Sequence, residues 1–197
     1  DYLTCSYFID VDGVGTCGNM DLKADIDTTT LVYGSDTISD VDGNIYNTVT
    51  IGTQKWMKEN LKTTKYPNGD EILNYWDAIQ MQNDTVGTYC IYNNNPALVE
   101  RYGRLYNWYA ITDSRNICPI GWHIPTVKDW ETLINFLGGE TVAGNKLKEA
   151  GTAHWKSPNT GADNSSGFTG LPGGLRYEYG DYYGFGTDGL FWLNSEN

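Results

Sequence analysis

Residues 126–137 carry the clearest periodic pattern of apolar and polar residues in the chain. The apolar side chains that fall on one helical face are Val127, Trp130, Leu133, Ile134 and Leu137. Thr126 can accept the amide proton of Asp129, and the Asp129 carboxylate can accept that of Thr126, as in a capping box. The pattern therefore predicts an amphipathic helix over 126–137, ended by Gly138 and Gly139, with one face in the core.

Other segments predict shorter elements. Alternating residues in 44–61 predict a β-hairpin that turns at Gly52-Thr53 and carries Trp56 inward. Apolar residues at helical spacing predict helices in 72–82 and around 103–112, and residues 143–151 predict a short polar helix or a turn. With few helices and several short strands, the predicted class is α+β.

The first 36 residues have a different pattern, with short apolar alternations broken by Asp, Thr and Gly. They predict a β-rich N-terminal extension, or the tail of a preceding β module, before a main domain over 37–197. The string DVDG occurs at 10–13 and 40–43 and resembles the front half of a calcium loop. Because neither copy has the downstream glutamate of such a loop, both are interpreted as Asp-Gly turns, with structural calcium as the alternative.

The C-terminal segment combines glycines with aromatic residues. Glycines spaced between aromatics favour tight β-turns that present side chains, although the same aromatics could instead complete the core. Tyrosine and phenylalanine offer large contact area at low conformational-entropy cost, so the segment is a candidate ligand surface. Its candidate residues are Tyr177, Tyr179, Asp181, Tyr182, Tyr183, Phe185, Asp188, Leu190 and Phe191.

Charge and composition limit the classes of partner that the chain is expected to bind. The formal net charge of −12 disfavours nucleic acid, whose phosphates are bound by clustered Lys and Arg. No run approaches the roughly 18 apolar residues of a membrane-spanning helix, so no membrane insertion is expected. The chain begins at Asp1 rather than at a methionine, which suggests a trimmed product.

Four cysteines and two histidines limit the metal and redox chemistry. Cys5, Cys17, Cys90 and Cys118 lack the spacing of a zinc site, and no cofactor or metal is expected. An even cysteine count with many Tyr, Trp, Gly and Asn residues favours an exported, oxidised domain, located outside the cell or on its surface. The alternative is a cytosolic domain whose cysteines are buried thiols. The natural disulfide pairs are Cys5 with Cys17 and Cys90 with Cys118, while other pairings stay open.

Several motifs resemble one known family. The run WHIPT at 122–126, followed by DWE at 129–131, resembles the second-helix entry of the C-type-lectin-like fold in the version shared with formylglycine-generating enzymes. Around it, four segments resemble, in order, the bacterial module called the Fibrobacter succinogenes major paralogous domain. These segments are DVDGNIYNTVTIGTQKWMKENL (40–61), YGRLYNWYAI (102–111), AGNKLKEAGTAHW (143–155) and GFTGLPGGLRY (167–177).

This resemblance implies a C-type-lectin-like domain over 37–197, with helices around 103–112 and 126–137 on a small twisted antiparallel sheet. Family members continue to a closing C-terminal strand, so the domain here is expected to lack it. Either residues beyond Asn197 supply that strand, or another segment or subunit covers the open edge. Catalysis does not carry over, because no cysteine follows Cys118, and the calcium motifs of sugar-binding lectins are absent. The side chain of His123 is interpreted as having a hydrogen-bonded structural role rather than a catalytic one.

The expected function is therefore non-catalytic recognition of a protein or glycan by the Gly/Tyr-rich C-terminal surface. That segment also resembles the variable region of proteins diversified by retroelements. Adenine-directed mutation of Asn codons yields Tyr, Asp, Ser and Leu, of which Tyr, Asp and Leu are present between Leu175 and Asn194. The alternative is a structural module of a surface adhesin or extracellular filament, with self-association through residues 1–36.

Overall fold

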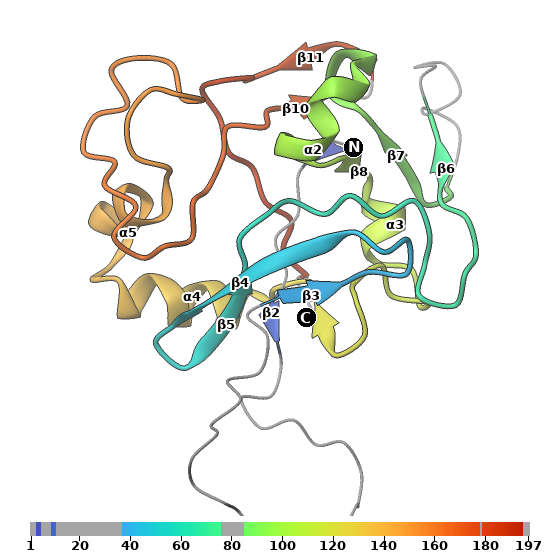
Figure 1. Cartoon of the computed structure of the whole chain (residues 1–197), viewed down its shortest axis with the longest axis horizontal. Coiled ribbons are helices and arrows are strands. Elements are labelled where there is room, and N and C mark those ends of the chain that lie inside the picture. The colour runs from blue at the N-terminus through green and yellow to red at the C-terminus, as the bar shows by residue number, and fades with distance from the viewer. Residues whose placement is uncertain (1–2, 5–8, 11–36, 76–84, 178, 195–197) are drawn as a thin grey trace, which may run out of the picture.

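The computed structural model of the chain describes residues 3–4, 9–10, 37–75, 85–177 and 179–194 (Figure 1). Within these residues, short helices accompany two small sheets whose strand pairs are antiparallel except for one. This arrangement confirms the predicted α+β class.

One sheet has the strand order β11-β10-β1-β8-β7-β6. Its strands are β1 (Leu3–Thr4), β6 (Leu73–Asn74), β7 (Thr88–Cys90), β8 (Leu105–Tyr106), β10 (Leu175–Arg176) and β11 (Tyr182–Tyr183). The β6 and β7 strands form the parallel pair. This sheet joins segments from both ends of the chain to its middle, so its pairing depends on contacts between residues distant in sequence.

The second sheet has the order β3-β4-β5-β2-β9 and contains the predicted hairpin. Its strands are β2 (Ile9–Asp10), β3 (Thr37–Ser39), β4 (Ile45–Ile51), β5 (Gln54–Met57) and β9 (Trp122–His123). In the hairpin, Ile51 lies opposite Gln54 around the Gly52-Thr53 turn, which confirms the prediction from the alternating pattern. Buried Tyr46 and Thr48 alternate with exposed neighbours along β4, so one face of the strand is core.

Two strands of the first 36 residues pair inside these sheets. Residues Leu3–Thr4 lie between β10 and β8, and residues Ile9–Asp10 lie between β5 and β9. The rest of the predicted N-terminal extension, including most of the first DVDG copy, lies outside the described residues.

The predicted helix over 126–137 is confirmed as α4 (Val127–Phe136). Both halves of the capping box are present, since Thr126 Oγ1 accepts from Asp129 N at 3.2 Å and Asp129 Oδ2 accepts from Thr126 N at 2.9 Å. Burial alone would raise the pKa of Asp129, but hydrogen bonds from Thr126 and His123 outweigh it and lower the pKa. The ionised cap therefore stabilises the fold above about pH 4 and loses this contribution as acid protonates Asp129.

Removing the cap gives a first test of this helix. Thr126→Ala is expected to lower the free energy of unfolding by about 1 kcal/mol, because it leaves the Asp129 amide without its acceptor. Thr132→Ala on the exposed side of α4 is the matched control and should change stability by less than about 0.5 kcal/mol. Chemical denaturation measures both, and equal effects of the two variants would contradict the assigned cap.

The remaining helices are shorter than predicted or lie elsewhere. They are α2 (Val99–Tyr102), α3 (Trp108–Ile111) and α5 (Glu140–Leu147), with 3-10 turns at Tyr92–Asn94 and Pro96–Leu98. The helix predicted around 103–112 is wrong over its first half, because Gly103 has a φ of 68° and residues 105–106 pair in the sheet as β8. Asn107 then caps α3 by accepting from Ala110 N at 2.9 Å.

The helix predicted over 72–82 is also wrong at its start, which is the part that the structure describes. Residues 73–74 pair with β7 as the strand β6, and residues 76–84 lie outside the described ranges. The predicted polar helix or turn at 143–151 is a helix over its first half, within α5.

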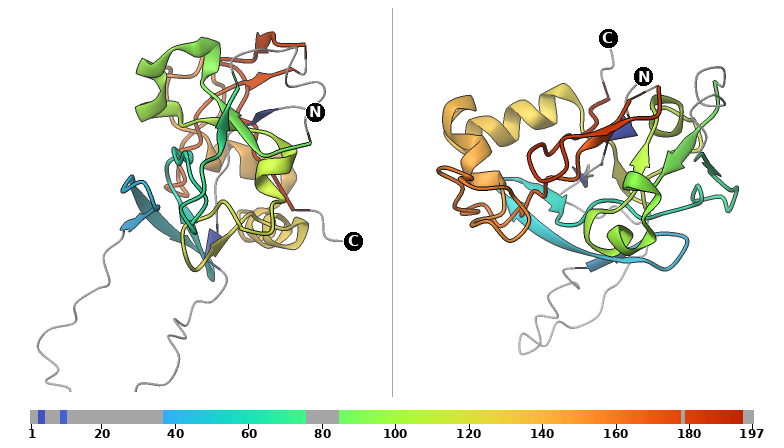
Figure 2. Two further views of the ribbon diagram at one scale, coloured as in Figure 1. Left: turned by 90° about the vertical axis from the view of Figure 1, so that its right-hand side faces the viewer. Right: turned by 90° about the horizontal axis from the view of Figure 1, so that it is seen from above.

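In Figure 2, α4 and α5 lie side by side at one end of the molecule. None of the helices in the described part of the chain is long and apolar enough to span a membrane.

The predicted disulfide between Cys90 and Cys118 is wrong, because both are free, buried thiols in separate apolar clusters. Cys90 lies with Leu105 at the six-stranded sheet, while Cys118 lies in the main core with Trp122. Burial raises the pKa of Cys90 to about 11 and that of Cys118 well above its ordinary value, so both are protonated at neutral pH. Cys5 and Cys17 lie outside the described residues, and their pairing stays a prediction.

Candidate functional site

The Gly/Tyr-rich segment folds into a β-hairpin at one edge of the six-stranded sheet, drawn at the top of Figure 1 beside α2. Leu175 of β10 lies opposite Tyr183 of β11, and Arg176 lies opposite Tyr182. The turn closes through hydrogen bonds from Gly180 N to Tyr177 O and from Tyr177 N to Asp181 O, both 2.9 Å. These bonds hold Tyr177, Gly180 and Asp181 in place at the two ends of the turn.

The turn and β11 together present a surface of tyrosines, which we call the aromatic hairpin surface. Its members are Tyr177, Tyr179, Asp181, Tyr182 and Tyr183. Tyr179 and Tyr183 keep 72% and 52% of their surface exposed, and Asp181 is also exposed. The rings of Tyr177 and Tyr183 meet edge to face at 5.0 Å between centroids. Exposed aromatic area held in this way is suited to contact a ligand.

A layer of aromatic rings lies beneath this surface. The ring of Tyr92 lies 5.0 Å from that of Tyr182 and 4.8 Å from that of Phe185, and Tyr102 continues the layer at 4.7 Å from Phe185. Tyr182 also donates a hydrogen bond from its hydroxyl to Asn94 Oδ1 at 3.2 Å. The loop that begins at Tyr92 therefore supports the hairpin, and its exposed Asn93 and Asn94 extend the surface.

Arg176 anchors the hairpin from inside, with only 2% of its surface exposed. Its Nε donates to Gly180 O at 3.2 Å and its Nη1 donates to Tyr75 O at 2.9 Å, so one side chain connects the turn to a distant segment. The guanidinium also lies 5.2 Å from the ring centroid of Tyr182. Burial raises the pKa of Tyr182, which keeps this hydroxyl neutral and able to donate.

A second turn ties the hairpin to the body of the domain. Asp188 N donates to Gly184 O at 2.8 Å, and Gly174 N donates to Asp188 O at 3.0 Å. Gly174 has a φ of 67°, and an added Cβ would meet Tyr183 O and lie 2.9 Å from both Phe185 N and Tyr92 Cε2. Glycine at this position therefore lets the hairpin, the second turn and the Tyr92 loop approach one another closely.

This close approach can be tested by Gly174→Ala. The variant is expected to destabilise the fold by more than Gly69→Ala, because the added methyl group collides with backbone atoms. The matched control, Gly69, also has positive φ, 92°, but an added Cβ there meets nothing within 4 Å. The control should lose only about 1–2 kcal/mol from backbone strain. Thermal unfolding measures both variants, and equal losses would show that the packing at Gly174 is not tight.

The nine candidate residues do not form one patch. None of the nine is fully buried, but Phe185 lies in the aromatic layer and Asp188 is exposed on the second turn. Leu190 is half-buried, and Phe191 packs on the main core with its ring centroid 5.9 Å from those of Trp130 and Phe168. The hairpin residues thus form a common surface, whereas Phe191 serves packing.

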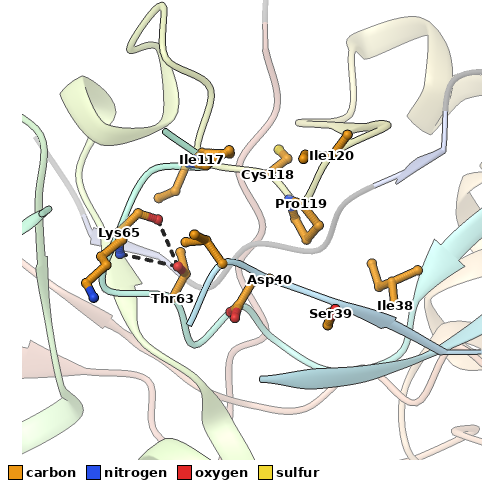
Figure 3. A pocket seen from close by; sticks show the side chains of 11 residues that line it. Ile38, Ser39, Asp40, Thr63, Lys65, Ile117, Cys118, Pro119 and Ile120 are labelled. Atoms are coloured by element: carbon orange, nitrogen blue, oxygen red, sulfur yellow. Dashed lines mark hydrogen bonds between the residues drawn. The ribbon is translucent and has the colours of Figure 1, made fainter. Parts of the chain in front are cut away.

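A separate pocket of about 360 Å³ lies between β3, residues 63–67 and the turn at 117–120 (Figure 3). Ile120, with 90% of its surface exposed, stands at its rim, while buried Cys118 contributes to its wall. Thr63 Oγ1 donates to Lys65 O at 2.8 Å, and Lys65 Nζ lies 3.7 Å from Asp42 Oδ1. Thr63 and Lys65 are thus engaged, the first with the Lys65 backbone and the second with Asp42 outside the pocket lining, and their arrangement indicates no particular reaction.

The second DVDG copy forms the turn next to this pocket. Asp40 accepts hydrogen bonds from Asp42 N at 3.0 Å, Asn44 N at 2.9 Å and Tyr46 Oη at 2.5 Å. Asp42 in turn accepts from the hydroxyl of Thr64 at 2.8 Å. The two carboxylates hold the turn and link it to the next segment, in accord with the interpretation as an Asp-Gly turn.

His123 is joined to the α4 cap rather than to a cluster of ligands. Its Nε2 lies 3.1 Å from Asp129 Oδ2, the oxygen that also accepts from Thr126. In the described ranges, no group of three or more His, Cys, Asp or Glu side chains is placed to hold a metal ion.

Comparison with known proteins identifies one family. The family model described as Fibrobacter succinogenes major domain matches residues 49–197, which include α4, the aromatic hairpin surface and the Tyr92 loop. No curated protein and no solved structure matches the chain.

Proposed function

The chain belongs to the Fibrobacter succinogenes major domain family, and from this premise we propose that it is a non-catalytic, extracellular ligand-binding domain. Its ligand contacts the aromatic hairpin surface. The observation that carries the proposal is the exposure of Tyr179 and Tyr183 on a hairpin whose turn is held by Arg176 and by backbone hydrogen bonds. A preorganised turn has little ordering entropy to lose on binding, so exposed aromatic area contributes more to affinity.

The chemistry of the surface suits a protein or a glycan. Tyrosine rings stack on sugar faces and fill shallow protein pockets, and their hydroxyls add hydrogen bonds. Exposed Asp181, Asn93 and Asn94 form polar neighbours around the rings. Aromatic anchors surrounded by polar groups are the usual composition of a recognition surface.

We also propose that the domain is C-type-lectin-like and that a retroelement diversifies its C-terminal segment. The capped helix α4 beside the β4–β5 hairpin supports the fold proposal. Tyr, Asp and Leu residues within 175–194 support the second proposal, because adenine-directed mutation of Asn codons yields them. Sequencing the gene's surroundings tests it: a nearby reverse transcriptase and a near-copy of the DNA for 173–197 are expected, and their absence would contradict it.

The binding proposal is tested by mapping the amide hydrogens that a bound ligand protects from exchange. The chain is applied to glycan arrays and to displayed surface proteins, and amide hydrogen exchange is then measured on the free chain and on the chain with each ligand found. Slower exchange is expected in peptides that cover 177–183 and 92–95. Protection confined to the Figure 3 pocket around Ile120, with none in the hairpin, would contradict the proposal.

A structural role in a surface adhesin or filament is the second candidate. The observation that favours it is the position of β1 and β2, which complete both sheets with strands from the N-terminal end. Such strands can connect neighbouring copies.

A further inference from the structure

The strands β1 and β2 occupy the middle of both sheets although they belong to the first ten residues. Thr4 lies opposite Leu175 of β10 and opposite Tyr106 of β8. Ile9 lies opposite Trp56 of β5 and opposite His123 of β9. One short segment thus joins the two halves of each sheet.

Without this segment, the pairing edges of β10, β8, β5 and β9 would all lack their partner. Unpaired edges offer rows of backbone N–H and C=O groups to any extended chain. Two of these strands also carry core residues, since Trp56 and Trp122 are buried. We call the two gaps, one between β10 and β8 and one between β5 and β9, the strand slot. The backbone pairs fix the register of the strands that fill it.

The segment that connects β2 to β3 is longer than its path requires. Through the pairs Asp10–Lys55, Thr50–Lys55 and Thr37–Asn47, the two ends are three strand spacings apart and offset by three residues. Such a path measures about 17 Å. The 26 residues of 11–36 can span up to about 90 Å. This length allows β1 and β2 to reach either their own slot or that of a neighbour.

We propose that the strand slot is a self-assembly site, which takes β1 and β2 of a second copy of the chain in a reciprocal exchange. The exchanged strand makes the same backbone pairs as in the monomer, so the two states differ mainly by the cost of association. The occupant is a second copy because register and length already match this segment. In the full chain, its own strand competes at an effective concentration of about 1 mM, so exchange occurs at comparable protein concentrations. This inference does not depend on the ligand of the aromatic hairpin surface.

A cysteine lock tests the exchange in the full chain. Directly opposed residues of paired strands have Cα atoms about 4.5–5.5 Å apart, within disulfide range, so Thr4→Cys with Leu175→Cys can fix the strand in its own slot. The background carries Cys5→Ser and Cys17→Ser, and two samples receive tags of different mass. They are oxidised while dilute, mixed at about 1 mM, and analysed by native mass spectrometry.

The reduced chains are expected to form mixed dimers, and the oxidised chains are expected to stay monomeric. Dimers that form equally in the locked chain would overturn the proposal, because they use another surface. Absence of mixed dimers from the reduced chains would overturn it as well.

A shortened connection gives a second test. Deleting residues 12–36 leaves Val11, which spans only about 7 Å and cannot reach the chain's own slot. The deletion is expected to lower the concentration of half-dimerisation by at least about 100-fold, because the competing strand is removed. Light scattering after gel filtration measures it, and a folded monomer would overturn the proposal. If the shortened chain does not fold, the comparison of mixed-dimer formation by the oxidised and reduced full chains decides whether the strands exchange.

Discussion

Replacing Trp56 by alanine is expected to lower the free energy of unfolding by about 3–5 kcal/mol. No part of Trp56 is exposed, and its ring lies 5.0 Å from that of Trp130 and 5.9 Å from that of Phe168. It therefore connects β5 with α4 and with the loop that carries Phe168. The cost combines lost apolar burial with a cavity that three elements would have to close.

The matched control is Phe136→Ala, which removes an aromatic ring of which 64% is exposed. This control should change stability by about 1 kcal/mol or less, because most of the ring already faces solvent. Equilibrium denaturation in urea measures both variants. A loss below about 1 kcal/mol for Trp56→Ala would contradict its place at the centre of the core.

The elements predicted correctly from the sequence depend on neighbours along the chain. The α4 helix has its capping box, its apolar stripe and its terminal glycines within one continuous stretch. The β4–β5 hairpin needs only alternation and the turn at Gly52-Thr53. In both cases, local propensity and the tertiary fold favour the same structure.

The incorrect predictions involve pairing between distant residues. Residues 103–112 have helical spacing, but Leu105 pairs with Cys90 in the sheet, so a contact over 15 residues overrides the local pattern. The predicted Cys90–Cys118 disulfide is also wrong because it required two residues distant in sequence to meet in the fold. Cysteine parity alone does not indicate that the two thiols lie in different clusters.

The candidate site could be predicted only in part. Its tyrosines stand out in the sequence because glycines separate them, and the structure places Tyr177, Tyr179 and Tyr183 on one hairpin. Its supports were missed, because nothing local links Tyr92 or Arg176 to the hairpin. The three asparagines at 93–95 are typical of a loop, but only the fold brings Asn94 within hydrogen-bonding distance of Tyr182.

The central claim is that ligand affinity depends on the aromatic hairpin surface. The combined substitution Tyr177→Ala, Tyr179→Ala and Tyr183→Ala removes its largest contact areas, two of which are mostly exposed. Aromatic anchors at the centre of an interface each contribute about 1–2 kcal/mol or more, so affinity should fall by at least about 100-fold. Stability should change little by comparison, because these side chains lie outside the main core.

The most direct measurement is therefore the Kd of the ligand identified by screening, determined calorimetrically for wild type and for this triple variant. A second triple variant, Val41→Ala, Ile120→Ala and Phe136→Ala, removes exposed apolar side chains elsewhere and serves as the matched control. At least about 100-fold weaker binding is expected for the tyrosine variant, and less than about threefold weaker binding for the control. A tyrosine variant that binds within threefold of wild type, while remaining folded, would contradict the central claim.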